Sequence, residues 1–291
     1  RPRLPRVRVL GARIGRLVRP ARLRVARWLA PEYEQELRKA RRQLRRSRKK
    51  AKAAQAELEI ARRHPPLFDG PLPARVVQTV EAVRAEHLTY LKAGMLEDLA
   101  AGVLRLERDG LRGLIVEAGT ARGGSAIVMA AAKEPERPMK VYDVFGMIPP
   151  PSEADGADVH RRYEQIAAGA AKGPGDGTYY GYRDDLYHEV EASFARHDVP
   201  VGGHNVELVR GLFEDTIRLD EPVALAHLDG DWYESTMTCL TRIAPLLVSG
   251  GRIVLDDYFM WSGCRKAVDE YFAGRDGFRF EHRSRLHVVR D

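Results

Sequence analysis

The sequence predicts an α/β fold in which a mostly parallel central sheet is covered by helices on both faces, preceded by a basic helical N-terminal arm. Helical and strand-like segments alternate after residue 74, an order that indicates a parallel sheet. At 291 residues the chain can hold one large domain with an appendage, and 44% hydrophobic residues are ordinary for a globular core. A third observation, the distribution of charge, places the boundary between the two parts.

The net charge of +7 averages two different regions. Residues 1–63 hold 22 Lys and Arg against 5 Asp and Glu, a net charge of +17, whereas the remaining 26 basic and 36 acidic residues give −10. Such a break in charge indicates a domain boundary. We therefore expect a basic arm over 1–63, a Pro-rich linker over 64–73 and a globular α/β domain over 74–291.

The arm divides into two stretches. Residues 1–30 alternate Arg with aliphatic residues, and Pro20 prevents one continuous helix there. Residues 32–63 are predicted to be helical, with Leu37, Leu44 and Leu58 spaced by multiples of seven. Three interpretations stay open: a solvated or partly disordered tail, a helix that binds an anionic membrane surface or a partner, including a second copy, and a non-specific nucleic-acid contact.

The sequence also argues against several classes of protein. Two cysteines, Cys239 and Cys264, do not make a disulfide framework or a CxxC zinc site. No stretch reaches the roughly 18 consecutive apolar residues of a membrane span, and the N-terminus lacks the apolar core of a secretory signal. We expect a cytoplasmic protein, with possible peripheral association at the inner membrane face through the arm.

After the linker, residues 74–110 are predicted to be helical, with Gly110 closing the last helix. Short apolar runs then predict strands within 113–119, 139–145, 205–211, 222–229 and 251–257, and residues 278–290 predict a hairpin at the sheet edge. In sheets of this kind ligands bind at the carboxyl ends of the strands, near the switch in strand order. Every candidate site below lies at such an end.

The first candidate site is the glycine-rich loop "VEAGTARGGSA", residues 116–126, between a strand and a helix. Glycines let a ligand approach the backbone and the free N–H groups of the helix start. The spacing is not the GxGxxG of dinucleotide sites, and a carboxylate before the loop suits a cationic amino-acid end, as in S-adenosylmethionine. A dinucleotide site or a plain tight turn are the alternatives. The candidate cofactor residues are Glu117, Gly119, Thr120, Gly123 and Ser125.

The next two strands end in further candidates. Asp143 lies 24 residues after Gly119, where a carboxylate can accept hydrogen bonds from ribose hydroxyls; a helix cap is the alternative. The loop at 209–216, "VRGLFEDT", lies beside the adenine in this type of fold, so Gly211 and Phe213 are predicted to pack against the ring.

Four aspartates follow two more apolar strands. Asp229 and Asp231 flank one glycine in "HLDGDWYEST", and Asp256 and Asp257 end "GGRIVLDD". Clustered carboxylates make each other harder to ionise, which indicates a positive charge placed among them. Alternatively they form turns and helix caps. His227, two residues before Asp229, is either a base or a packed core histidine.

Together these motifs resemble the macrocin-O-methyltransferase (TylF-like) family of bacterial sugar methyltransferases. "VEAGTARGGSA", "YDVFGMIPPPSEAD", "VRGLFEDT", "HLDGDWYEST" and "GGRIVLDDYF" carry the resemblance, which covers roughly residues 75–291. It implies a Rossmann-like class I fold that binds S-adenosylmethionine, with Asp229 also contacting this cofactor. The arm over 1–63 falls outside the resemblance.

The resemblance also implies a Mg²⁺ ion held by Asp229, Asp256 and Asp257, a ligand set that suits a hard cation. The resemblance further implies that Asp231 is the general base, which takes the proton of the acceptor hydroxyl. The implied acceptor is a sugar or glycosylated small molecule. A catechol-type or other small-molecule O-methyltransferase is one alternative. A non-catalytic scaffold protein acting through its arm is another.

Residues 146–183 form a long Pro- and Gly-rich stretch between strands. Long loops in compact enzymes often act as lids, and the stretch contains Tyr179, Tyr180 and Tyr182, which could stack on an acceptor.

Overall fold

The computed structural model describes residues 38, 39, 41–45 and 64–291. Contacts along the chain divide it into two units, residues 1–59 and 60–291, and each is described by itself. In the first unit, residues 38–39 and 41–45 are helical. The other expectations for the arm concern residues that lie outside the described ones. No helix in the described part of the chain is long and apolar enough to cross a membrane.

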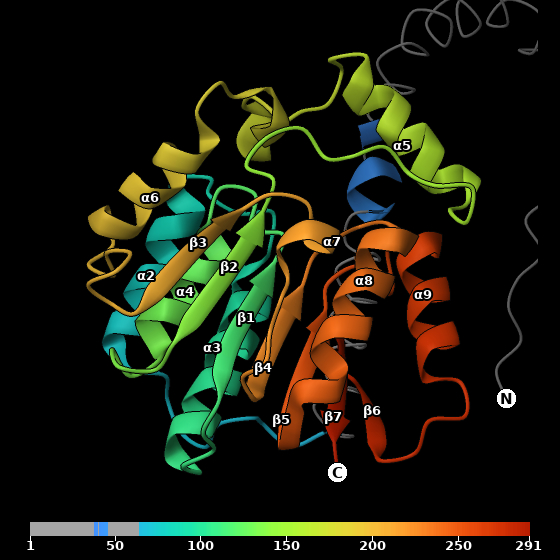
Figure 1. The fold of residues 1–291 in the computed structure, drawn as a ribbon. Coiled ribbons are helices and arrows are strands. Elements are labelled where there is room, and N and C mark those ends of the chain that lie inside the picture. Colours follow the sequence, from blue (N-terminus) through green and yellow to red (C-terminus); the bar gives the residue numbers. More distant parts are fainter. Residues whose placement is uncertain (1–37, 40, 46–63) are drawn as a thin grey trace, which may run out of the picture. The chain divides into compact units, whose positions relative to one another are not determined.

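The second unit is built on a seven-stranded sheet with the order β3-β2-β1-β4-β5-β7-β6 (Figure 1). Its first five strands run parallel, and β7 and β6 form an antiparallel hairpin at the edge. The strands are β1 (Leu114–Ala118), β2 (Met139–Asp143), β3 (Val206–Arg210), β4 (Val223–Leu228), β5 (Leu247–Leu255), β6 (Phe278–His282) and β7 (Leu286–Arg290). Six of these strands fall within predicted runs, and β5 begins at Leu247, four residues before the predicted run 251–257. The α/β fold and its edge hairpin are confirmed.

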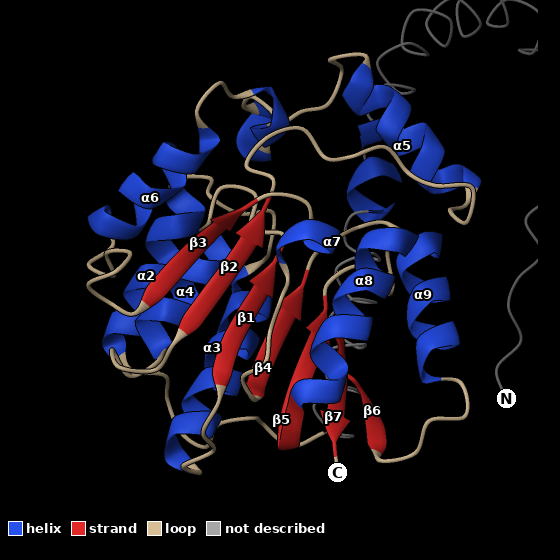
Figure 2. Cartoon of the chain, viewed as in Figure 1, coloured by secondary structure: helices blue, strands red, loops and turns tan. Residues whose placement is uncertain are grey.

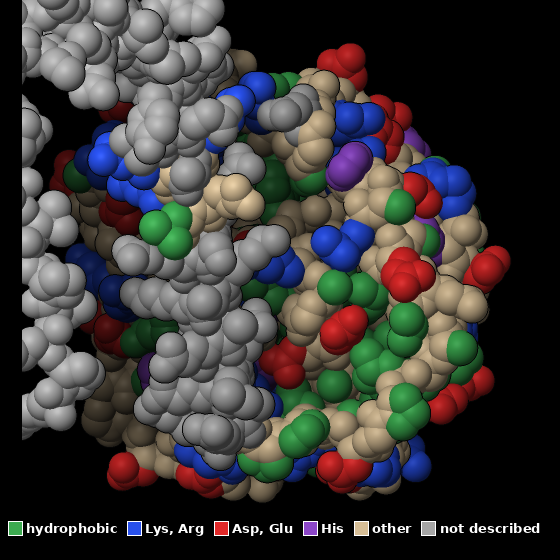
Figure 3. Space-filling model, turned by 180° about the vertical axis from the view of Figure 1, so that it is seen from behind, with side chains coloured by type: hydrophobic (Ala, Val, Ile, Leu, Met, Phe, Trp, Pro, Cys, Tyr) green, Lys and Arg blue, Asp and Glu red, His purple; other side chains and the backbone are tan. Residues whose placement is uncertain are grey.

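Helices cover both faces of the sheet. The central strands β1 and β4 are buried along their whole length because their two apolar faces meet two separate cores. One core packs against α2 (Ala74–Ala85), α3 (Ala93–Arg108), α4 (Gly124–Ala132) and α6 (Leu186–Arg196). The other packs against α8 (Tyr233–Ile243) and α9 (Ser262–Phe272). Acidic, basic and apolar side chains are interspersed over the part of the back face that Figure 3 leaves in view.

Two helices, α5 (Ala157–Ala167) and the short α7 (Phe213–Thr216), lie beyond the carboxyl ends of the parallel strands (Figure 2). The strands β1, β2 and β4 end together beneath them, at the point where the strand order switches from β1 to β4. A crevice for a ligand is expected at this switch point.

The predicted helical stretch 74–110 is divided into α2 and α3 by residues 86–92. The chain turns at His87, whose φ is 56°, and Leu88 is buried directly afterwards. The carbonyl of Leu88 accepts a hydrogen bond of 3.1 Å from the backbone N–H of Gly124, and a Cβ atom on Gly124 would lie 2.7 Å from that oxygen. The interruption between α2 and α3 therefore places residues 88–91 against the start of α4, beside the glycine-rich loop.

Candidate active site

The glycine-rich loop between β1 and α4 has a backbone conformation that requires glycine at two positions. Gly119 has a φ of 88°, and a Cβ atom there would lie 2.0 Å from the carbonyl oxygen of Asp229. Gly123 has a φ of 86° and precedes the first residue of α4. The close approach to Asp229 brings the end of β1 and the end of β4 together, so the loop and the acidic residues share one site.

Asp143 at the end of β2 shapes this loop. Its Oδ2 atom accepts hydrogen bonds from the backbone N–H groups of Thr120 (2.8 Å) and Ala121 (3.1 Å), and its Oδ1 atom accepts one from Phe145 (2.7 Å). Burial raises the pKa of Asp143, and these three N–H groups oppose that rise by stabilising the carboxylate. The carboxylate also lines the cavity beside the loop.

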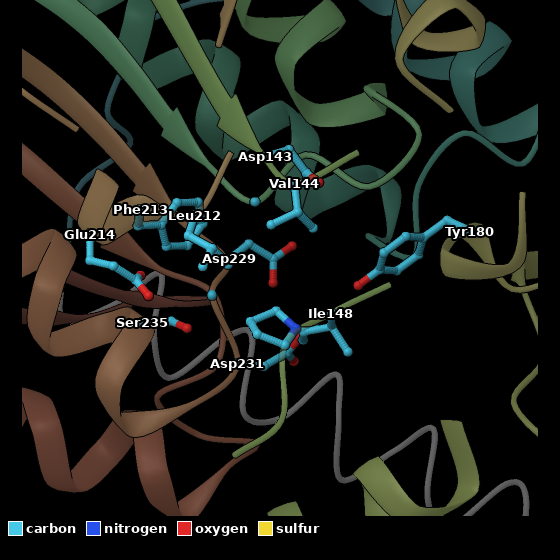
Figure 4. A pocket seen from close by; sticks show the side chains of 13 residues that line it. Asp143, Val144, Ile148, Tyr180, Leu212, Phe213, Glu214, Asp229, Asp231 and Ser235 are labelled. Carbon is cyan, nitrogen blue, oxygen red and sulfur yellow. The ribbon is translucent and has the colours of Figure 1, made fainter. Parts of the chain in front are cut away.

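A first cavity opens at these strand ends, with Asp143, Leu212, Phe213 and Asp229 on its walls (Figure 4). Asp143 and Asp229 provide hydrogen-bond acceptors, and the Leu212 and Phe213 side chains provide an apolar surface. Polar acceptors beside an apolar wall suit a ligand that carries hydroxyl groups and a flat ring, as the nucleoside part of S-adenosylmethionine does. Gly211 has a φ of 146° and donates its N–H to the Asp143 carbonyl at 3.0 Å, which turns the chain from β3 towards this wall.

Glu117, in contrast, faces the interior. It is fully buried on β1, where it is the register partner of His227 on β4. Its Oε1 atom lies 2.8 Å from Nδ1 of His227, and its Oε2 atom accepts a hydrogen bond of 2.7 Å from the hydroxyl of Thr120. Neither Glu117, Thr120 nor Ser125 lines the cavity, although all three were candidate cofactor residues. All three residues are buried in this structure.

His227 is held between two carboxylates. Besides Glu117, the Oδ1 atom of Asp256 lies 3.7 Å from its Nε2 atom. Burial alone would lower the pKa of His227, but the negative charges of Asp256 and Glu117, together with the hydrogen bond to Glu117, raise it to about 10. An imidazolium at neutral pH cannot accept a proton, so this geometry disfavours His227 as the base.

The register of β4 with β5 aligns Leu228 with Leu255, so that the aspartates following both strands lie side by side. Carboxylate oxygens of Asp229, Asp231 and Asp257 lie within 4.8 Å of one another, close enough to hold a metal ion. The backbone N–H of Asp231 donates to Oδ2 of Asp257 at 3.1 Å, and Asp231 has a φ of 56°. This turn directs Asp231 towards the cavity (Figure 4).

The three carboxylates are difficult to ionise together. Burial, followed by the charges of neighbouring aspartates, raises the pKa values of Asp229 and Asp257 well above the ordinary value. Burial also raises the pKa of Asp231 to about 7, although a hydrogen bond with Trp261 and the charge of Arg162 oppose the rise. A divalent cation among them would relieve the repulsion, so these residues fit a hard metal ion.

Asp256 has a different environment. It forms a two-contact ion pair with Arg285, in which Nη2 and Oδ2 are 3.0 Å apart and Nε contacts Oδ1. Arg285 and His227 keep the pKa of Asp256 low, despite burial. The structure thus groups Asp231 with Asp229 and Asp257, whereas the sequence predicted Asp256 as the third metal ligand. The physical reason is the guanidinium of Arg285, which satisfies Asp256 from the β6–β7 turn.

The segment 146–183 is ordered by hydrogen bonds to the sheet domain. The indole N–H of Trp232 donates to the Pro149 carbonyl at 2.9 Å, and Asp155 accepts from the backbone N–H of Tyr233 at 2.8 Å. Tyr182 donates to the Ile166 carbonyl at 2.5 Å, so it supports the segment rather than facing a ligand. Tyr179 and Tyr180 line the space beneath it.

That space is a second cavity of about 510 Å³. It shares Gly119, Asp143, Asp229 and Asp231 with the first cavity, so the two form one continuous site. A site of about 300–1,000 Å³ is typical for a small-molecule ligand. Residues that the sequence did not single out also line it, namely Tyr90, Arg162, Trp261 and Arg285. They come from four separate segments and carry no local motif, so only the folded chain identifies them.

The sequence profile of the macrocin-O-methyltransferase (TylF) family matches residues 84–276, well over half of the chain. The chain belongs to the macrocin-O-methyltransferase family. The predicted family is therefore confirmed, and the chain is an S-adenosylmethionine-dependent O-methyltransferase of the class I fold.

Several relatives of this methyltransferase are known. Demethyldecarbamoylnovobiocin O-methyltransferase from Streptomyces niveus is 31% identical over 199 residues, which cover 65% of this chain and 69% of the relative. The 8-demethyl-8-(2,3-dimethoxy-alpha-L-rhamnosyl)-tetracenomycin-C 4'-O-methyltransferase from Streptomyces olivaceus is 32% identical over 188 residues, which cover 62% of this chain and 66% of the relative. The solved structure of the O-methyltransferase NovP is similar with a TM-score of 0.57 and 27% identity, covering 72% of this chain and 88% of that one.

Replacing Asp143 by Ala in this methyltransferase should weaken binding of S-adenosylhomocysteine by about 1–3 kcal/mol, the range for a charged hydrogen-bond partner. Titration calorimetry measures the change. Asp220→Ala, at an exposed aspartate outside both cavities, is the control. Because Asp143 also holds the loop, thermal melting without ligand should be compared. An unchanged affinity in Asp143→Ala, or binding of NAD in place of S-adenosylhomocysteine, would contradict this assignment.

Proposed function

We propose that this enzyme transfers a methyl group from S-adenosylmethionine to a hydroxyl of a sugar or glycosylated small molecule, with Mg²⁺ as a second cofactor and Asp231 as the general base. The observation that carries the proposal is the single continuous site in which Asp143, the glycine-rich loop and the aspartates after β4 and β5 meet. The relatives support the acceptor class, because one is named for an acceptor that carries a rhamnosyl group.

For Mg²⁺ we propose Asp229 and Asp257 as ligands, since both belong to the cluster that can hold an ion. Asp256 is the third ligand that the sequence favours, and its use requires part of its pairing with Arg285 to be given up. When bound, the ion supplies a positive charge that favours ionisation of a nearby hydroxyl. Oxygen ligands of this kind suit Mg²⁺.

Asp231 then has a separate role. Its carboxylate lines both cavities and lies beyond Gly230, where it faces the space available to an acceptor. It would accept the proton of the acceptor hydroxyl while the oxygen forms its bond to the methyl carbon. When bound, S-adenosylmethionine would supply the methyl group and its sulfur would keep the electron pair of the broken carbon–sulfur bond, while Asp231 would hold the proton until it passes to solvent. Leu212, Phe213 and the glycine-rich loop, which line the first cavity with Asp143, would hold the nucleoside part of S-adenosylmethionine in place.

The acceptor class is tested by incubating the enzyme with S-adenosylmethionine, Mg²⁺ and a panel of glycosides beside a simple catechol. Formation of S-adenosylhomocysteine should be seen with a glycoside. Exclusive turnover of the catechol would favour the catechol-type alternative. S-adenosylhomocysteine binding without turnover of any acceptor in a panel that includes the relatives' glycosylated acceptors would favour a binding protein.

For the arm we propose association with anionic membrane surfaces at the inner membrane face, based on its net charge of +17 over residues 1–63. Removing residues 1–63 should leave a domain that still binds S-adenosylhomocysteine but no longer co-sediments with anionic vesicles at low salt, because each Lys or Arg near such a surface contributes about 1 kcal/mol. Equal binding to neutral vesicles, or no loss on truncation, would reject this. A change in oligomeric mass would instead favour the helix as an association element.

A further inference from the structure

The second cavity has two opposed walls of different chemistry. Carboxylates at the ends of β4 and β5 form one wall, and the helix α5 forms part of the other. Arg162, Gln165 and Ile166 of α5 line the cavity. Their spacing of three and four residues places them on one helix face. Arg161, next to Arg162, is exposed and does not line the cavity.

Arg162 has no ion pair within the described part of the chain. The other arginine in the cavity wall, Arg285, is already paired with Asp256. The half-buried Arg162 guanidinium lies over the Tyr179 ring, with its Cζ atom 5.8 Å from the ring centre, in a cation–π contact. A guanidinium stays charged at all physiological pH values and offers five N–H donors in a planar fork. A partly buried cation of this kind is stabilised when an anion occupies the space before it.

The helix that carries Arg162 is fixed in position. Asp158 in the first turn of α5 accepts hydrogen bonds from the backbone N–H (3.0 Å) and the hydroxyl (2.5 Å) of Ser262 at the start of α9. Lys266 of α9 also donates to the Ala154 carbonyl at 3.2 Å. A residue on an anchored helix presents its charge at a defined distance from the strand ends, which favours recognition over general charge balance.

We propose that the acceptor of this enzyme carries an anionic group, a carboxylate or a phosphate, and that Arg162 is the specificity-determining residue that binds it. The proposal rests on the proposed function, because it places the methylated hydroxyl at Asp231 and the anionic group at the opposite wall. Both anions match the guanidinium in charge and can accept two parallel N–H bonds from it. The charge of Arg162 acts on Asp231 through space and opposes the rise that burial causes in the pKa of Asp231. No carboxylate oxygen in the described residues lies within 4.0 Å of Arg162, however, so its guanidinium is available to a bound anion.

The test uses the full chain saturated with S-adenosylhomocysteine and Mg²⁺, titrated calorimetrically with glucose, glucuronate and glucose 6-phosphate. At least one charged sugar should bind roughly tenfold more tightly than glucose, and the one that does identifies the anion as carboxylate or phosphate. Arg162→Met, which keeps the chain length without the charge, should abolish this preference. Arg162→Lys should retain part of it, and the neighbouring exposed control Arg161→Met should retain all of it.

The proposal is overturned if no charged sugar binds the native protein more tightly than glucose, whether or not glucose binds. It is also overturned if the preference survives in Arg162→Met. Binding of S-adenosylhomocysteine and melting temperature are measured for each variant, and both should match the native protein. Loss of S-adenosylhomocysteine binding in the native chain would instead count against the proposed function, whereas methylation of neutral and charged sugars at equal efficiency would count against the role of Arg162 alone.

Discussion

Asp231→Asn should turn over roughly 10²–10⁴-fold more slowly than the native enzyme, the range expected when a general base is removed. The amide keeps the size and hydrogen-bonding reach of the carboxylate, so binding of S-adenosylhomocysteine should be unchanged. The backbone N–H of Asp231, which donates to Asp257, is also retained. The measurement is kcat under saturating cofactor and Mg²⁺, with metal affinity determined in parallel by calorimetry.

The pH profile gives a second measurement of the same role. A base acts only when it is deprotonated, and the pKa of Asp231 without a metal ion is about 7. The native rate should therefore fall as the pH drops through this range, or at a lower pH where a bound cation stabilises the carboxylate. Asp231→Asn should lack this step. A native rate in the variant, or a defect confined to metal affinity, would show that Asp231 is not the base; the latter result would make it a ligand, as its distance from Asp229 and Asp257 allows.

Chelation with EDTA should abolish turnover, and added Mg²⁺ should restore it. The physical reason is the cluster of partly buried carboxylates, which repel one another unless a cation lies among them. Asp257→Asn should behave like the chelated enzyme, with a loss of activity on the order of 10²-fold or more at ordinary Mg²⁺ concentrations. Asp229→Asn should likewise weaken the binding of Mg²⁺.

A matched control is Asp215→Asn, at an exposed aspartate in the short helix after β3 that lines neither cavity. It should keep native activity and metal affinity. The Mg²⁺ affinities of Asp256→Asn and Arg285→Met, measured side by side, show whether Asp256 binds the metal directly or stays paired with Arg285. Full activity in EDTA would remove Mg²⁺ from the proposed mechanism.

The fold and the location of the site followed from local sequence patterns. The five parallel strand-like runs are separated by helices, and each ends in a glycine or a carboxylate, so the order of elements and the edge at which they meet could be predicted. The glycine-rich loop was identifiable from its glycines between a strand and a helix. The structure gives the physical reason for one of them, because any side chain at Gly119 would strike the backbone of Asp229. Four aspartates after two strands likewise indicated one shared site.

Which of these carboxylates face the site was decided by the tertiary structure. Glu117 is paired with His227 because the register of β1 with β4 places them side by side, 110 residues apart in sequence. Asp256 is paired with Arg285, which comes from the turn of an edge hairpin. Arg162 reaches the cavity because α5 is attached to α9. The sequence by itself determined the elements, their order and the edge at which the aspartates gather, since these depend on local patterns. The partner of each charge was decided only by the packing of distant segments, because a carboxylate and a guanidinium pair through space and leave no local pattern in the chain.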